Sequence, residues 1–197
     1  MVNLSAGAAP KAGQRVRQTH PAYAHTRVYH ALWLPPQWLP PIDGGRSSTT
    51  RFNHPKLFAR RFPVIVEFSG NGPWQASPAP GAAPDVSTGR PEDQNMGWGM
   101  SNGGDAYIWV SMPLLTADLG ANTDVSTWWW GCNSTKAFVG PYGCGTYNIT
   151  PTVDYVKKTV RYVIDEYGGD PDAVFAAGWS RGAVACGYIG LHDDEIA

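Results

Sequence analysis

Residues 150–191 read TPTVDYVKKTVRYVIDEYGGDPDAVFAAGWSRGAVACGYIGL, and this stretch decides the fold. Apolar side chains between Val153 and Tyr167 recur mostly at spacings of three and four, which predicts a helix over 150–167 with one apolar face. Gly168-Gly169 ends that helix, a turn is expected at 170–172, and 173–177 (AVFAA) is a short buried strand. A second helix, rich in small residues, follows 178–182 (GWSRG).

Upstream, three more apolar segments predict strands. FPVIVEF (62–68) and AYIWVSM (106–112) are typical of strands buried on both faces of a parallel sheet, and RVYHALWL (27–34) ends at two prolines. Strands that alternate with helices and long loops predict an α/β domain over 26–197, with a mostly parallel sheet flanked by helices. Residues 1–25 are polar and without period, so a flexible N-terminal arm is expected there.

Composition narrows the class of protein. The 197 residues include 23 Gly and 17 Pro, which predicts long loops, above all at 35–60, 75–105 and 113–149. A hydrophobic content of 43% excludes a disordered chain, and a net charge of -1 excludes a basic surface for nucleic acid. No stretch approaches the roughly 20 apolar residues of a membrane span, and the first residues lack the apolar run of a signal peptide.

The cysteines and glycosylation sequons bear on the compartment. Cys132 and Cys144 bound a Gly-containing loop that a disulfide could close, and the pair is read either as bridged or as two free thiols. Three sequons, at Asn3, Asn133 and Asn148, favour a secreted protein, with the cytoplasm as the alternative. Histidines, cysteines and carboxylates show no ligand-like grouping, so neither a metal nor a cofactor is expected.

The pentapeptide at 178–182 matches the pattern GxSxG. A nucleophile elbow needs a strand before the serine, a sharp turn at it and a helix after it, and the predicted elements occur in that order. The glycines two residues on either side of Ser180 leave room where the backbone segments crowd together. The alternative is an ordinary strand-to-helix turn with Ser180 as a helix cap.

With this elbow, the segments 27–38 (RVYHALWLPPQW), 64–74 (VIVEFSGNGPW) and 107–113 (YIWVSMP) resemble the α/β-hydrolase superfamily. The pattern is most similar to feruloyl esterases, polyhydroxybutyrate depolymerases and prolyl-oligopeptidase-like hydrolases, over about residues 26–192. The resemblance implies that Ser180 is the nucleophile, activated by a histidine that a carboxylate orients. It also implies an oxyanion hole made by the backbone N–H groups of Arg181 and Asn71, while Ser69 stands where many relatives have histidine.

Tryptophans cluster around these segments. Trp74, Trp179 and the run Trp128, Trp129 and Trp130 follow predicted strands or lie in the elbow. They are read either as core and loop packing or as an aromatic floor for a carbohydrate, aromatic or polymeric ester substrate.

The catalytic acid and base have no evident place in the chain. The family order is serine, acid, histidine, but only 17 residues follow Ser180, and a continuous helix would carry His192 about 18 Å away. One of the early histidines (His20, His25, His30 and His54) could serve only if the N-terminal arm folded over the elbow. The chain is therefore expected to be the N-terminal part of an ester-cleaving serine hydrolase domain, inactive by itself. A prolyl-oligopeptidase-type peptidase and a noncatalytic glycan-binding member of the fold are the alternatives.

Overall fold

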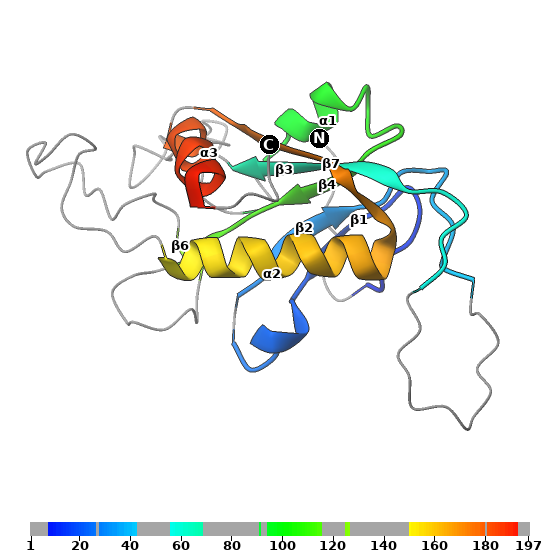
Figure 1. Cartoon of the computed structure of the whole chain (residues 1–197), viewed down its shortest axis with the longest axis horizontal. Coiled ribbons are helices and arrows are strands. Elements are labelled where there is room, and N and C mark those ends of the chain that lie inside the picture. The colour runs from blue at the N-terminus through cyan, green and yellow to red at the C-terminus, as the bar shows by residue number, and fades with distance from the viewer. Residues whose placement is uncertain are drawn as a thin grey trace, which may run out of the picture.

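A computed structural model describes residues 8–26, 28–42, 56–68, 91, 94–115, 125–126, 150–179 and 181–192 (Figure 1). Its elements, in chain order, are β1 (Arg15–Gln18), the 3₁₀ turn η1 (Pro21–Tyr23), β2 (His30–Trp33), β3 (Phe62–Phe68), α1 (Met96–Met100), β4 (Ile108–Ser111), β5 (Leu114–Leu115), β6 (Val125–Ser126), α2 (Thr150–Tyr167), β7 (Gly169–Gly178) and α3 (Arg181–His192).

The main sheet has the strand order β1-β2-β4-β3-β7 and is mixed. β3 pairs in parallel with both β4 and β7, whereas β2 is antiparallel to its neighbours β1 and β4. Four of the five strands therefore run in one direction, and only β2 is reversed. The α/β fold predicted from the sequence is confirmed, with helices flanking a sheet that is parallel around β3.

Alternation along β3 sends its side chains into two cores. Val64, Val66 and Phe68 face a large core that also holds the apolar face of α2 and the buried residues of α3. Ile65 faces a smaller core with Trp33 and Trp109, against which residues of α1 pack. The sheet therefore forms the middle layer, with α2 on one side and α1 on the other (Figure 1).

β7 changes register along its length. Phe62 pairs with Gly169 and Val64 with Val174, so five residue steps on β7 oppose two on β3. From Val64 to Phe68 the pairing is regular, and the last residue of β3 lies opposite Gly178, the last residue of β7. The shift absorbs 170–172, where the sequence predicts a turn, and leaves the carboxyl ends of the two strands level.

Other differences from the sequence expectations lie at 8–25 and near residue 100. The described part of the expected flexible arm contains β1, which is paired to β2 and buries Arg15 and Val16. β1 has only four residues, and one of its buried side chains is the charged Arg15, so the sequence lacks the apolar pattern that predicts a strand. α1 forms inside the expected loop at 75–105, and β5 and β6 pair within the one expected at 113–149. No helix among the described residues has both the length and the apolarity to cross a membrane.

Candidate functional site: the turn between β7 and α3

The chain leaves β7 through a tight turn and enters α3 at once. The backbone N–H of Gly182 donates to the carbonyl of Trp179 at 2.9 Å, which closes a four-residue turn over 179–182. β7 ends at Gly178 and α3 begins at Arg181, so the strand, turn and helix predicted around GWSRG are present in that order. The Trp179 side chain is 44% exposed beside this turn.

Only glycine fits at position 178, because there is no room there for a Cβ atom. A Cβ on this residue would lie 2.5 Å from the carbonyl carbon and oxygen of Gly182 and 2.8 Å from the Cys186 Sγ, distances that real Cβ atoms do not adopt. Because the strand end passes directly against the first turn of α3, a side chain at 178 would push the helix away. The glycine at 178 is thus explained by its close contact with the backbone of the first turn of α3.

Cys186 is the nearest described thiol to this turn. Burial raises its pKa to about 12, and the nearby Glu67 carboxylate acts in the same direction. The side chain is therefore a neutral thiol at physiological pH, and a thiol in this state is a poor nucleophile. Its part in the turn is to fill the space beside Gly178.

A buried carboxylate anchors the carboxyl end of β3 to α1. Glu67 is 1% exposed, and its two oxygens accept hydrogen bonds from the backbone N–H groups of Met96 (2.8 Å) and Gly97 (2.8 Å) and from the Trp109 Nε1–H (2.7 Å). The donors include the first N–H groups of α1, which a carboxylate satisfies well. Glu67 thereby fixes β3, β4 and α1 to one another at the edge where β7 also ends.

Arg15 is a second buried charge on this side of the sheet. Its guanidinium donates to the Pro91 carbonyl (2.7 Å) and to the Ser111 Oγ (2.8 Å) and lies over the Trp109 ring, 4.1 Å from the centroid. β1 is therefore held to β4 by a side chain that crosses β2. Sequence reasoning missed both charges. The signal for Glu67 was a lone acid in the otherwise apolar FPVIVEF.

His30 lies at the same sheet edge as the turn but in β2, three strands away, or roughly 14 Å at ordinary strand spacing. It points to the α2 side, where Nδ1 contacts the Tyr155 hydroxyl at 2.8 Å and Nε2 the Gln18 Oε1 at 3.0 Å. Gln18 accepts from Nε2–H, so Nδ1 is the acceptor for Tyr155. Burial, reinforced by His20, lowers the pKa of His30 to about 3.

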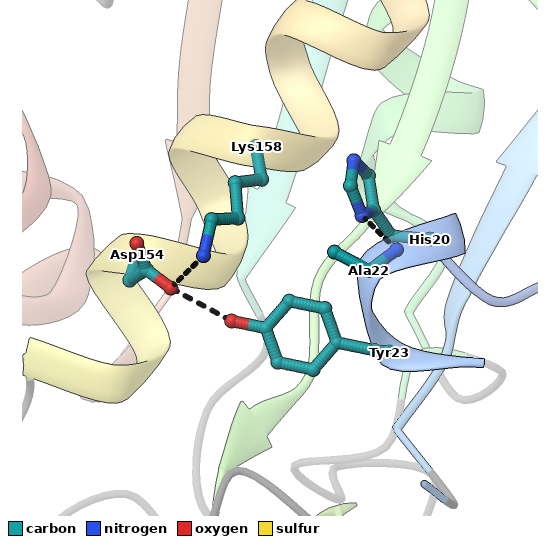
Figure 2. A network of polar contacts seen from close by, with 5 residues as sticks. All are labelled: His20, Ala22, Tyr23, Asp154 and Lys158. Atoms are coloured by element: carbon teal, nitrogen blue, oxygen red, sulfur yellow. Dashed lines mark hydrogen bonds and ion pairs between the residues drawn. The ribbon is translucent and has the colours of Figure 1, made fainter. Parts of the chain in front are cut away.

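His20 belongs to a different cluster, at the contact between η1 and α2 (Figure 2). Its Nδ1 accepts from the Ala22 N–H at 3.1 Å, while Tyr23 donates to the Asp154 Oδ2 at 2.8 Å and Lys158 donates to the same oxygen at 2.6 Å. Burial and Lys158 lower the pKa of His20. The cluster fastens the segment before β2 to α2, so this segment does not fold over the turn into α3.

The remaining predicted site residues divide into two groups. The Arg181 backbone opens α3, and His192 is its last residue, eleven positions and about 16 Å further along the helix axis. Ser180, Asn71, Trp74, Trp128, Trp129, Trp130, Cys132, Cys144 and His54 lie outside the described residues. Within the described part of the chain, no three His, Cys, Asp or Glu side chains gather in a way that could hold a metal ion.

A scan against models of protein families, a search of curated proteins and a search of solved structures each find no match to this chain.

Proposed function

We propose that this chain carries the nucleophile of an α/β-hydrolase-type serine hydrolase that cleaves carboxylic esters. The observation that supports this most is the turn over 179–182, where strand β7, a closed turn and helix α3 follow one another around Ser180. An ordinary helix cap does not need a glycine at 178, yet here only glycine fits. That crowding is typical of a nucleophile elbow.

In the proposed reaction, the Ser180 Oγ attacks the ester carbonyl carbon while a general base takes its proton. The base returns the proton to the departing alcohol, and an acyl-enzyme remains on Ser180. Water then attacks the acyl carbon and loses a proton to the same base. The bond between the acyl carbon and the Ser180 Oγ breaks, the base returns the proton to Oγ, and the carboxylic acid leaves. The backbone N–H of Arg181, at the start of α3, and that of Asn71 are proposed to hold the oxyanion.

The level ends of β3 and β7 support this arrangement of donors. Phe68 lies opposite Gly178, so the chain that leaves β3 toward residue 71 and the chain that leaves β7 toward residue 180 start at the same edge. Ligands of parallel sheets bind at this edge. The hydrogen bonds of Glu67 to α1 hold the carboxyl end of β3 in place, which supports the proposed position of the oxyanion donor that follows β3.

We propose that the general base comes from outside the described residues. His30 is buried with both ring nitrogens engaged, and His20 is held at the contact between η1 and α2. A histidine and an orienting carboxylate supplied elsewhere would complete the site. The 197-residue chain by itself is accordingly proposed to provide the nucleophile and the two oxyanion donors without turnover.

A fluorophosphonate probe tests the proposal on the complete natural gene product. We expect covalent labelling that peptide mass spectrometry assigns to Ser180, that Ser180→Ala abolishes and that Cys186→Ala leaves intact. The cysteine variant is the matched control because the Cys186 thiol lies beside Gly178 at the same turn. Acetyl, feruloyl and peptide substrates then separate an esterase from a prolyl-oligopeptidase-type peptidase.

The exposed Trp179 favours a second candidate, a noncatalytic member of the fold that holds glycans on aromatic side chains. Absence of labelling at Ser180 would reject both hydrolase functions. Glycan binding that Trp179→Ala abolishes would then support this candidate.

A further inference from the structure

Two buried side chains of opposite charge lie on the α1 side of the sheet, and the Trp109 indole joins them. The Arg15 guanidinium lies over the ring, 4.1 Å from its centroid, while the ring Nε1–H donates to the Glu67 Oε2 at 2.7 Å. A carboxylate that accepts from the N–H makes the ring more electron-rich, which strengthens its attraction for the cation. The two contacts of the indole therefore reinforce each other.

Arg15 also contacts the strand residue beside Glu67. Its guanidinium donates to the Ser111 Oγ at 2.8 Å, and Ser111 is the residue of β4 that pairs directly with Glu67 of β3. On its other side Glu67 pairs with Ala177, one residue before the end of β7. The charge on β1 is therefore linked, through two residues of β4, to the sheet edge where Ser180 is proposed to act.

The backbone of α1 closes in on the same ring. A Cβ on Gly97 would lie 2.3 Å from the Cδ1 and Nε1 atoms of Trp109, so this backbone lies directly against the edge of the indole. The Gly97 N–H donates to the same Glu67 oxygen as the indole does. The ring meets Arg15 on its face and Glu67 and Gly97 at its edge, so a rotation of the ring would break several contacts at once.

The two charges fix the chain on either side of residues 69–90. Arg15 donates to the Pro91 carbonyl at 2.7 Å, and Glu67 accepts from the Met96 N–H at 2.8 Å, where α1 begins. Glu67 also directly precedes Phe68, the last residue of β3, which comes three residues before position 71. A change at either charge is therefore transmitted to the end of β3.

We propose that Arg15 and Glu67 act through Trp109 as one unit that positions the end of β3, and with it the oxyanion donor proposed at Asn71. Both are positioning residues for the proposed reaction, and this inference rests on the proposed function. A donor stabilises the oxyanion only when it lies where the negative charge develops. A displaced donor therefore lowers kcat and leaves KM nearly unchanged.

A double-mutant cycle on the complete natural gene product tests the proposal. Arg15→Met and Glu67→Gln should each lower kcat for an ester about tenfold, with KM within about twofold of wild type. Because the two residues act as one unit, the double variant should also lose about tenfold, and not the roughly hundredfold of independent effects. Arg17→Met, the same change on the same strand, is the matched control and should keep kcat within about twofold.

A second substrate separates positioning from a general loss of stability. In a thiono ester, sulfur replaces the carbonyl oxygen and is a weaker acceptor, so hydrolysis depends less on the oxyanion donors. The ratio of kcat/KM for the oxygen ester to that for the thiono ester should fall about fivefold in the Arg15 and Glu67 variants. Val163→Ala truncates a buried side chain of α2 and should leave this ratio unchanged.

Circular dichroism and titration of Ser180 with a fluorophosphonate give the folded fraction of each variant. If Arg15→Met does not fold, Arg15→Lys, which keeps a charge over the ring, should lower the ratio by a smaller factor. Trp109→Phe removes the N–H donated to Glu67 and keeps an aromatic ring beside the cation, so it should lower the ratio as Glu67→Gln does.

Three results would overturn the proposal: independent losses in the double variant, an unchanged ratio in the single variants, or an equal fall in the ratio for Val163→Ala. Each would be obtained with a wild-type protein that is labelled at Ser180, so the proposed hydrolase function would stand. A wild-type protein without labelling at Ser180 would instead reject the proposed function together with this inference.

Discussion

The Trp109 indole Nε1–H donates to the Glu67 Oε2 at 2.7 Å across the parallel pair β3 and β4. The same oxygen accepts from the Gly97 N–H, so a strand, its neighbour and a helix share one buried atom. A carboxylate that receives three hydrogen bonds is worth more to the fold than an ion pair in solvent.

Replacing Glu67 should therefore cost stability. Glu67→Gln retains one acceptor but turns an NH₂ group toward an N–H donor, and we expect a loss of about 1–3 kcal/mol in the free energy of unfolding. Glu67→Ala should cost more, because it leaves all three donors unpaired. Urea unfolding measures both. Glu166→Gln, which removes a surface partner of Lys56, is the control and should change stability by less than about 1 kcal/mol.

Glycine substitutions in and beside α3 should have opposite effects. Gly178→Ala places a Cβ against the Gly182 carbonyl and should destabilise the protein by about 1–3 kcal/mol, with loss of any activity that depends on Ser180. Gly187→Ala, in the same helix with nothing near its Cβ, should stabilise by about 0.5–1 kcal/mol. Thermal unfolding of the pair distinguishes crowding at the turn from a general effect of removing glycine.

The two arginines of β1 make a second matched comparison. Arg15→Met removes the hydrogen bonds to Pro91 and Ser111 and should lower stability by about 2–4 kcal/mol. Arg17→Met alters an exposed side chain over the Tyr29 ring and should cost about 1 kcal/mol or less. Equal effects would show that β1 is not held by the buried guanidinium.

Acid should weaken the fold through His30. The unfolded chain takes up a proton near pH 6.5, whereas the folded protein stays neutral at His30 down to about pH 3. The unfolded state therefore binds more protons in this window, and stability falls as pH falls from about 6.5 to 3, by up to roughly 5 kcal/mol. Urea titrations at several pH values should show a smaller slope for His30→Gln and an unchanged one for His25→Gln.

Trp179 offers a prediction about the proposed substrate. Because its ring is exposed, Trp179→Ala should leave the melting temperature nearly unchanged. If the ring packs against an aromatic acyl group, kcat/KM of the complete natural gene product should fall up to about tenfold for feruloyl esters and less for acetyl esters. Trp179→Phe should recover most of the difference. Equal losses for both esters would argue against this contact.

Segments with a regular apolar pattern could be predicted from the sequence. Segments whose structure depends on hydrogen bonds to one distant side chain could not. The helix at 150–167, the strand at 62–68 and the crossing into α3 follow from apolar spacing and glycines, and the structure has the first two with the same bounds. α1 was missed because MGWGM contains two glycines and depends on Glu67 for its first hydrogen bonds. At the turn, the glycine at 178 is explained by its contact with Gly182. The hydrogen bonds of Glu67 depend on where α1 and Trp109 lie in the fold, which sequence alone does not give.

The register shift in β7 has a consequence for how this chain can vary. Three extra residues lie between Gly169 and Val174 relative to the facing strand, and they do not disturb the pairing of Val64 with Val174 or of Phe68 with Gly178. Insertions and deletions at 170–173 can therefore occur while Gly178 keeps its place opposite Phe68 at the end of β3. Changes in chain length at the amino end of β7 are therefore taken up by the register shift. They leave the carboxyl end of the strand, where the chemistry is proposed, in the same position.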